Sequence, residues 1–121
     1  MRPEVNALRR AALASTRSTY DIEKQFHLRS LRHQQTRIAY FKHILITEPR
    51  ASFTHYTREI GEAVKIAQEH AAKINQIELV VPKILSQIHI RCAQLDRENN
   101  LAAILKAWDD MTKSDHLDVN F

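Results

Sequence analysis

The sequence predicts an all-α protein: a long antiparallel helical hairpin or a small helical bundle with coiled-coil-like packing, plus a short C-terminal amphipathic helix. The 121 residues include one glycine, Gly61, and three prolines, so few residues interrupt long helices. Apolar residues recur at spacings of three and four over residues 53–81, which is the period of one helix face. The two long helical stretches, 4–46 and 52–98, are also nearly equal in length, as the arms of a hairpin would be.

The first helix is expected over residues 4–46. Pro3 and Glu4 are typical of a helix start, because proline fits the first turn and an acidic residue there is stabilised by the helix dipole. Residues 15–19 have the weakest helical propensity of this half, so the helix either breaks there or runs through. Pro49 ends the element, because the residue before a proline avoids helical geometry.

Apolar side chains of the first helix are expected to form two stripes. The early stripe occupies positions 5, 8, 12, 19, 22 and 26, which include Ile22 and Phe26. The later stripe is shifted by about two residues and comprises Leu28, Leu31, Ile38, Phe41 and Leu45. The shift predicts that the buried face of the helix rotates along its length and that the helix changes neighbours.

The second helix is expected over residues 52–98, with Ser52 as its N-cap. Residues 74–92 are the most apolar stretch of the chain, and a helix that is apolar on more than one face is normally buried on more than one side. This pattern predicts an interface core that packs against another helix. Its expected members are Phe53, Tyr56, Ile60, Val64, Ile74, Ile77, Val81, Ile84, Leu85 and Ile88.

Pro82 lies inside this helix and has three interpretations. It kinks a continuous helix, it begins a separate helix as a first-turn residue, or it follows a short buried strand over residues 77–81. The strand ranks last, because the sequence offers no second strand to pair with it. The apolar spacing continues through the proline without slipping, which favours the kink.

A third, short helix is expected over residues 101–113, followed by a flexible acidic tail over 114–121. The length of the chain predicts that residues 1–113 form a single helical domain. The third helix has the anchor spacing of a helix that docks in a partner's groove, although the same residues would also close the core of the chain itself. These anchors are Leu101, Ile104, Leu105 and Trp108.

The sequence contains no pattern typical of an enzyme or a cofactor site. One glycine excludes the glycine-rich phosphate loops, and neither HExxH nor the Glu-x-x-His pairs of helical di-iron proteins occur. Cys92 and His89 lie one turn apart, but a metal site needs three or four ligands. We therefore expect no catalytic residues, no metal and no cofactor, and we do not expect an enzyme.

Composition indicates a soluble, intracellular protein, either cytoplasmic or nuclear. No apolar run approaches the roughly 18 to 20 residues that a membrane-spanning helix needs. No apolar run follows Arg2, so no signal peptide is expected. The single cysteine, Cys92, fits a reducing compartment.

Positive charge is concentrated in the first half of the chain. Residues 1–50 carry ten Lys and Arg against four Asp and Glu, whereas residues 51–121 carry eight against ten. This asymmetry indicates either helix faces that complement each other in a bundle or a basic surface for an anionic partner. In the second case the possible nucleic-acid contacts are Arg9, Arg10, Arg17, Arg29, Arg32 and Arg37.

The function that these patterns favour is a small helical protein–protein interaction module: a subunit, an adaptor or a chaperone-like partner. It would act by burying apolar helix faces in a homo- or hetero-oligomer, with a second copy or another helical chain as its partner. Charged residues beside the apolar faces would set the register and the choice of partner. The alternative is a nucleic-acid-associated accessory protein that uses the basic N-terminal half.

Overall fold

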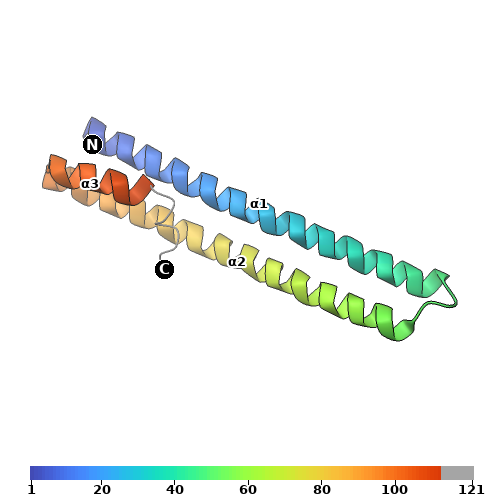
Figure 1. The fold of residues 1–121 in the computed structure, drawn as a ribbon. Coiled ribbons are helices and arrows are strands. Elements are labelled where there is room, and N and C mark those ends of the chain that lie inside the picture. Colours follow the sequence, from blue (N-terminus) through green and yellow to red (C-terminus); the bar gives the residue numbers. More distant parts are fainter. Residues whose placement is uncertain (113–121) are drawn as a thin grey trace. The chain divides into compact units, whose positions relative to one another are not determined.

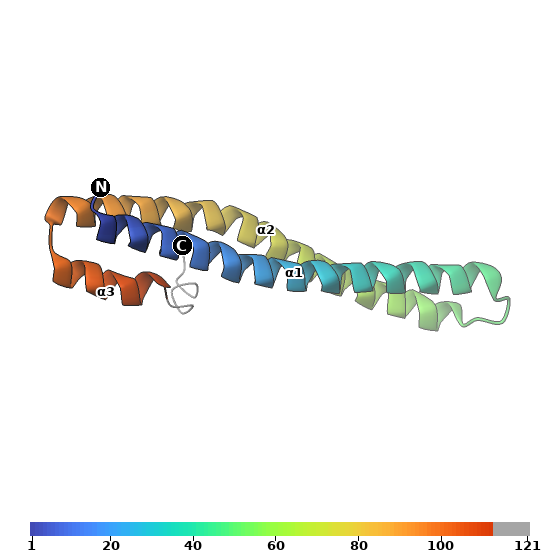
Figure 2. The same ribbon diagram turned by 90° about the horizontal axis from the view of Figure 1, so that it is seen from above.

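The computed structural model is all-α over residues 1–112, the part of the chain that the structure describes (Figure 1). Helix α1 spans Pro3–Thr47, α2 spans Phe53–Glu98 and α3 spans Leu101–Thr112. Helices α1 and α2 pack closely as an antiparallel hairpin, and α3 is the short C-terminal helix (Figure 2). The predicted fold class is thereby confirmed. The predicted tail over 114–121, and position 113 of the predicted third helix, lie outside the described residues.

Side-chain caps define where α2 and α3 begin. The Ser52 hydroxyl oxygen accepts a hydrogen bond from the backbone N–H of His55 at 3.2 Å, as an N-cap does. The Asn100 side-chain oxygen accepts one from the backbone N–H of Ala103 at 3.3 Å. Between the two helices, Asn99 has a φ of 54°, the left-handed conformation that commonly ends a helix. The two asparagines thus form a compact corner between α2 and α3.

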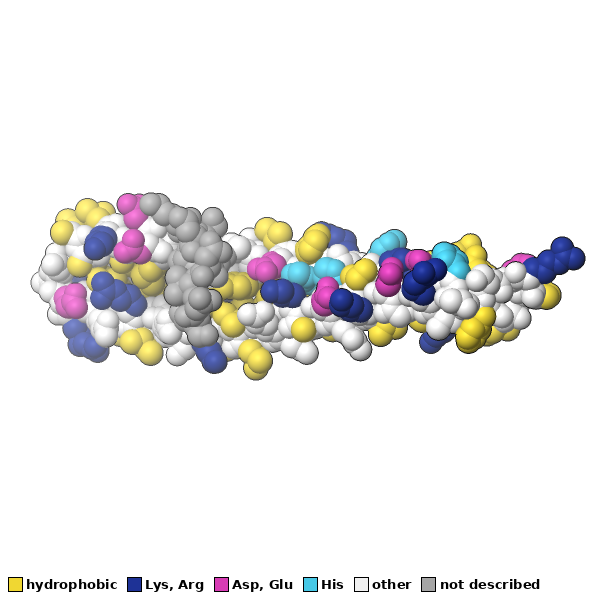
Figure 3. Space-filling view, turned by 60° about the horizontal axis from the view of Figure 1, so that its bottom comes forward, with side chains coloured by type: hydrophobic (Ala, Val, Ile, Leu, Met, Phe, Trp, Pro, Cys, Tyr) yellow, Lys and Arg dark blue, Asp and Glu magenta, His cyan; other side chains and the backbone are white. Residues whose placement is uncertain are grey.

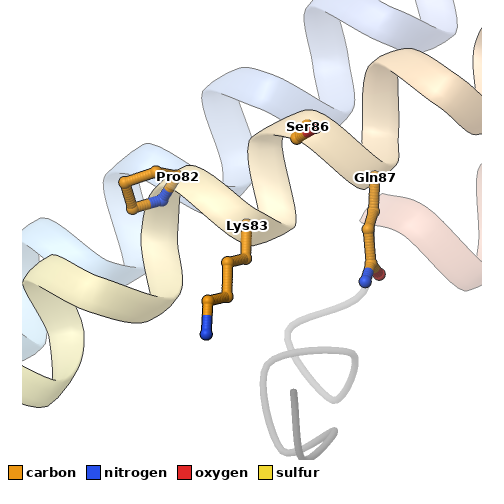
Figure 4. Close-up of a pocket in the computed structure, with 4 residues that line it drawn as sticks. All are labelled: Pro82, Lys83, Ser86 and Gln87. Carbon is orange, nitrogen blue, oxygen red and sulfur yellow. The ribbon is translucent and has the colours of Figure 1, made fainter.

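Both long helices continue through the positions at which the sequence allowed a break. Helix α1 has no break over residues 15–19, where the Thr16 side chain is buried. Helix α2 continues through Pro82, which is exposed, with its ring on the outer side of the helix (Figure 4). Proline lacks the amide hydrogen that the preceding turn would bind, so this position weakens α2 locally.

Contacts within the chain define two compact units. Unit 2 comprises Glu23–Gln76, the end of α1 and the start of α2 with the loop that joins them. Unit 1 comprises Met1–Ile22 together with the chain from Ile77 onward, which adds the rest of α2 and all of α3. The expectation of a single helical domain stays a prediction.

Unit 1 has a closed core to which all three helices contribute. Its buried cluster comprises Val5, Leu8, Ala12 and Tyr20 from α1, Ile77, Ile84, Ile88, Cys92 and Leu95 from α2, and Ile104 and Ala107 from α3. The backbone N–H of Arg2 donates a hydrogen bond to the Asp96 carboxylate at 2.8 Å, and this bond ties the start of α1 to α2. The Ser15 hydroxyl donates to the carbonyl oxygen of Thr112 at 3.3 Å, which ties α1 to the end of α3.

Unit 2 contains two helices, and its packing is correspondingly incomplete. Only Gln34, Ala63 and Ile74 are buried among its residues. Two helices can cover only the strip of side chains between them, so most apolar residues of this unit remain half-exposed.

The early apolar stripe predicted for α1 is wrong at two positions. Ile22 and Phe26 are 67% and 53% exposed, whereas Thr16 and Tyr20 are buried instead. Polar residues therefore also lie on the side of α1 that packs in the core, and an assignment based on hydrophobicity misses them.

Replacing Pro82 with alanine should stabilise unit 1. Alanine restores the missing backbone hydrogen bond, and its side chain faces solvent as Pro82 does, so a gain of about 2 kcal/mol in the free energy of unfolding is expected. Urea unfolding followed by circular dichroism measures the change. Pro82→Ser serves as the matched control and should give a smaller gain of the same sign. A loss of stability in both variants would show that Pro82 itself stabilises unit 1.

The buried thiol of Cys92 should make unit 1 sensitive to alkaline pH. Burial raises the pKa of Cys92 above its usual value near 9.0, and Arg9 and Arg91 oppose this shift only in part. The unfolded chain therefore loses the thiol proton first as the pH rises. This contribution to stability is complete below about pH 9 and is lost at higher pH. Urea unfolding should show a smaller alkaline loss for Cys92→Ala than for the wild type, and equal losses would contradict this assignment.

Candidate functional site

Metal-ligating side chains do not gather anywhere in the described part of the chain. Within residues 1–112 no three His, Cys, Asp or Glu side chains lie close enough together to hold a metal ion. No helix in that range is long and apolar enough to cross a membrane. A hollow beside Pro82 is lined by one cation and two neutral polar groups, from Lys83, Ser86 and Gln87 (Figure 4). The surfaces of unit 2 carry side-chain clusters that are better candidates for a binding site than this hollow.

A pair of histidines joins the two helices of unit 2. His27 on α1 and His70 on α2 place their Nδ1 atoms 2.8 Å apart, within hydrogen-bond distance. Glu23 lies one turn before His27, with its carboxylate 3.9 Å from His27 Nε2. The ring of Phe26 packs edge-on against both imidazoles, at centroid distances of 5.2 and 6.1 Å. Histidine side chains reach the surface among acidic and basic residues on the face drawn in Figure 3.

Nearer the loop, the contact between the two helices is an ion pair followed by an aromatic pair. The guanidinium of Arg37 lies 3.3 Å from the Glu59 carboxylate and donates a hydrogen bond of 2.8 Å to the side-chain oxygen of Gln34. The rings of Phe41 and Tyr56 then pack at a centroid distance of 5.7 Å. Unit 2 is therefore held together by directional polar contacts as well as by apolar packing.

A hollow of about 290 Å³ opens beside the histidine pair. Most of its lining residues carry side chains that donate hydrogen bonds, and Phe26 supplies an apolar wall. The residues lining it are Phe26, Arg29, Ser30, His33 and Gln34 from α1 and His70 from α2.

The other side of the helix contact in unit 2 is apolar. By helical spacing, a set of half-exposed aliphatic side chains lies on the flank opposite Phe26 and Ser30. Val64, at its outer edge, is 36% exposed. We call this surface the apolar flank; it consists of Leu28, Leu31 and Ile38 on α1 and Ile60, Val64, Ala67 and Ala71 on α2.

The ten residues expected to form an interface core occupy three kinds of environment. Four of them, Ile74, Ile77, Ile84 and Ile88, are buried within the chain itself. Two, Phe53 and Val64, are exposed. The remaining four are half-buried: Tyr56, Ile60, Val81 and Leu85. Their role in contacts with another chain stays a prediction.

The residues of the predicted docking helix and the predicted nucleic-acid contacts likewise lie in different environments. On α3, Ile104 is buried and Trp108 packs against the core of unit 1, whereas Leu101 and Leu105 are exposed. Arg9 donates a hydrogen bond to Asn6, and Arg37 is held by Glu59. The four other predicted arginines are exposed: Arg10, Arg17, Arg29 and Arg32.

Sequence reasoning did not single out His27 and His70, although their spacing carries a signal. His70 lies seven residues after the buried Ala63 and seven before the buried Ile77, so it occupies a core position of the heptad pattern. His27 likewise lies seven residues after the buried Tyr20 and seven before the buried Gln34. Polar residues at such positions are commonly those that set the register of paired helices.

No protein-family model, no curated protein and no solved structure matches this chain.

Proposed function

We propose that the protein is a helical interaction module that assembles by burying the apolar flank of unit 2 against a second copy of the chain. The observation that carries this proposal is the state of that flank, whose aliphatic side chains are only half-covered by the two helices that bear them. Half-covered aliphatic side chains favour association, because removing apolar surface from water is favourable by roughly 25 cal/mol per Å².

The chemistry of the apolar flank supports a second copy as the partner. Its seven members include no charged residue, so two copies can face each other without like charges opposing. Ala67 and Ala71 are small and lie one turn apart on α2, where they would allow a partner helix to approach closely. Lys24 and Lys42, at the ends of the α1 portion, would lie at the solvated rim of such an interface.

Unit 1 provides a comparison within the same chain. There α3 supplies a third helix, and the cluster that all three helices form is buried. Unit 2 has only the two arms of the hairpin among the described residues. Helices from a second copy would give unit 2 the covering that α3 gives unit 1.

Val64→Asp should separate the assembled copies without unfolding the chain. The aspartate would leave an uncompensated charge in the interface, at a cost of roughly 3 to 5 kcal/mol, which weakens association more than a hundredfold. Light scattering after size exclusion measures the native mass, which we expect to be that of a dimer or larger for the wild type at both low and high salt. The control is Leu79→Asp, which adds the same charge at a residue of unit 1 that is 69% exposed. A monomeric wild type, or equal masses for the two variants, would contradict self-association.

A second function, association with nucleic acid, is favoured by the charge of α1. Residues 24–47 contain five Lys and Arg and no Asp or Glu. The exposed aromatic rings of Phe26 and Tyr40 lie along the same stretch, and exposed rings of this kind stack on unpaired bases in other proteins.

Reversing the charges of Arg29 and Arg32 tests this second function. The double change to glutamate should weaken binding of a single-stranded oligonucleotide and reduce the slope of affinity against salt by about 1 to 2. Fluorescence anisotropy over a salt series measures both quantities. Arg58→Glu changes an exposed arginine on α2 and is the matched control. An unchanged salt slope in the double variant would exclude these arginines as phosphate contacts.

A further inference from the structure

The hollow beside the histidine pair brings cationic and polar groups together. Arg29, Ser30 and His33 lie within about one turn of one another on α1, and His70 reaches the same hollow from α2. Arg29 and His33 have no acidic partner among residues 1–112. Arg37, by contrast, lies on the same helix and is already held by Glu59. The hollow thus combines a guanidinium that has no carboxylate partner among residues 1–112, a hydroxyl and two imidazoles.

We propose that this hollow is a binding site for a phosphate monoester group. A guanidinium can donate two parallel hydrogen bonds to phosphate oxygens, and charge-assisted bonds of this kind are the strong ones. The Ser30 hydroxyl and the imidazoles of His33 and His70 supply further donors around the same space. Phe26 closes one side with an apolar surface that would pack against the carbon atoms of the ester.

The contact between the histidines determines what His70 offers to a ligand. Because the two Nδ1 atoms share one hydrogen bond, only one of them carries a proton. The ring whose Nδ1 accepts this bond carries its own hydrogen on Nε2, because a neutral imidazole has one N–H. When His27 is the donor, the Nε2–H of His70 is available to an anion in the hollow that His70 lines. An anion in the hollow therefore favours the arrangement in which His27 donates and His70 accepts.

Charged groups from both helices surround the histidine pair. On α1, Glu23 lies beside His27, and Arg29 and His33 face the hollow. On α2, Glu69 and Lys73 lie within one turn of His70 and are exposed to solvent, which screens their charges.

Calorimetric titration of the full chain with inorganic phosphate and with O-phosphoserine tests the site. All titrations are run at one pH, near 8, so that the protonation state of the phosphate ligands is the same throughout. Arg29→Gln should weaken binding about tenfold or more, because it removes a charge-assisted pair of hydrogen bonds. Arg58→Gln is the control: it removes an exposed arginine on α2 that does not line the hollow, and it should bind as the wild type does. His70→Gln should bind more weakly, because it removes one of the imidazoles that line the hollow.

The two arginine variants decide the outcome, because both residues are exposed and neither change should disturb the fold. Equal weakening by Arg29→Gln and Arg58→Gln, or no binding of either ligand at about 10 mM, would overturn the proposal. Binding of an oligonucleotide but of neither small phosphate would also overturn it and would assign the arginines to a nucleic-acid backbone. The native mass of the protein, which tests self-association through the opposite flank, is an independent measurement.

Discussion

Two packed helices can shield only the strip of side chains between them, and the rest of this structure depends on that constraint. In unit 1, α3 is the third helix that closes the core around Leu8, Leu95 and Ile104, which are buried almost completely. In unit 2 the same two long helices have no third helix among the described residues. Its aliphatic side chains therefore stay half-exposed, and this unit carries the candidate surfaces.

Where apolar burial is limited, polar contacts between helices become more important for register. The histidine pair and the ion pair of Arg37 with Glu59 both join α1 to α2 in unit 2. Each has a defined geometry, so sliding one helix by a turn would break both contacts. The same contacts place His70 at the edge of the hollow and orient its ring. His70 thus belongs both to the contact that joins the two helices and to the lining of the hollow.

Much of the fold was predictable from the sequence, because helix propensity and apolar period are local properties. The scarcity of glycine and proline and the spacing of three and four along α2 were sufficient for an all-α hairpin with a short third helix. The candidate site was less predictable. Thr16, His27, Gln34 and His70 occupy inward positions, but an interpretation that follows hydrophobicity places Ile22 and Phe26 there instead. A strict seven-residue count from Ala63 would have identified His70.

The sequence by itself determined that the chain forms a helical hairpin with a short third helix, that Ser52 caps α2, and that positive charge gathers on α1. Tertiary structure alone decided which apolar residues are buried within the chain and which stay exposed. The reason is that burial depends on the number of helices meeting at each level, and that number is a property of chain contacts rather than of local sequence. It also brought His27 to His70 across 43 positions of the chain. No local pattern specifies a contact over that separation, because the pairing of the two helices creates it.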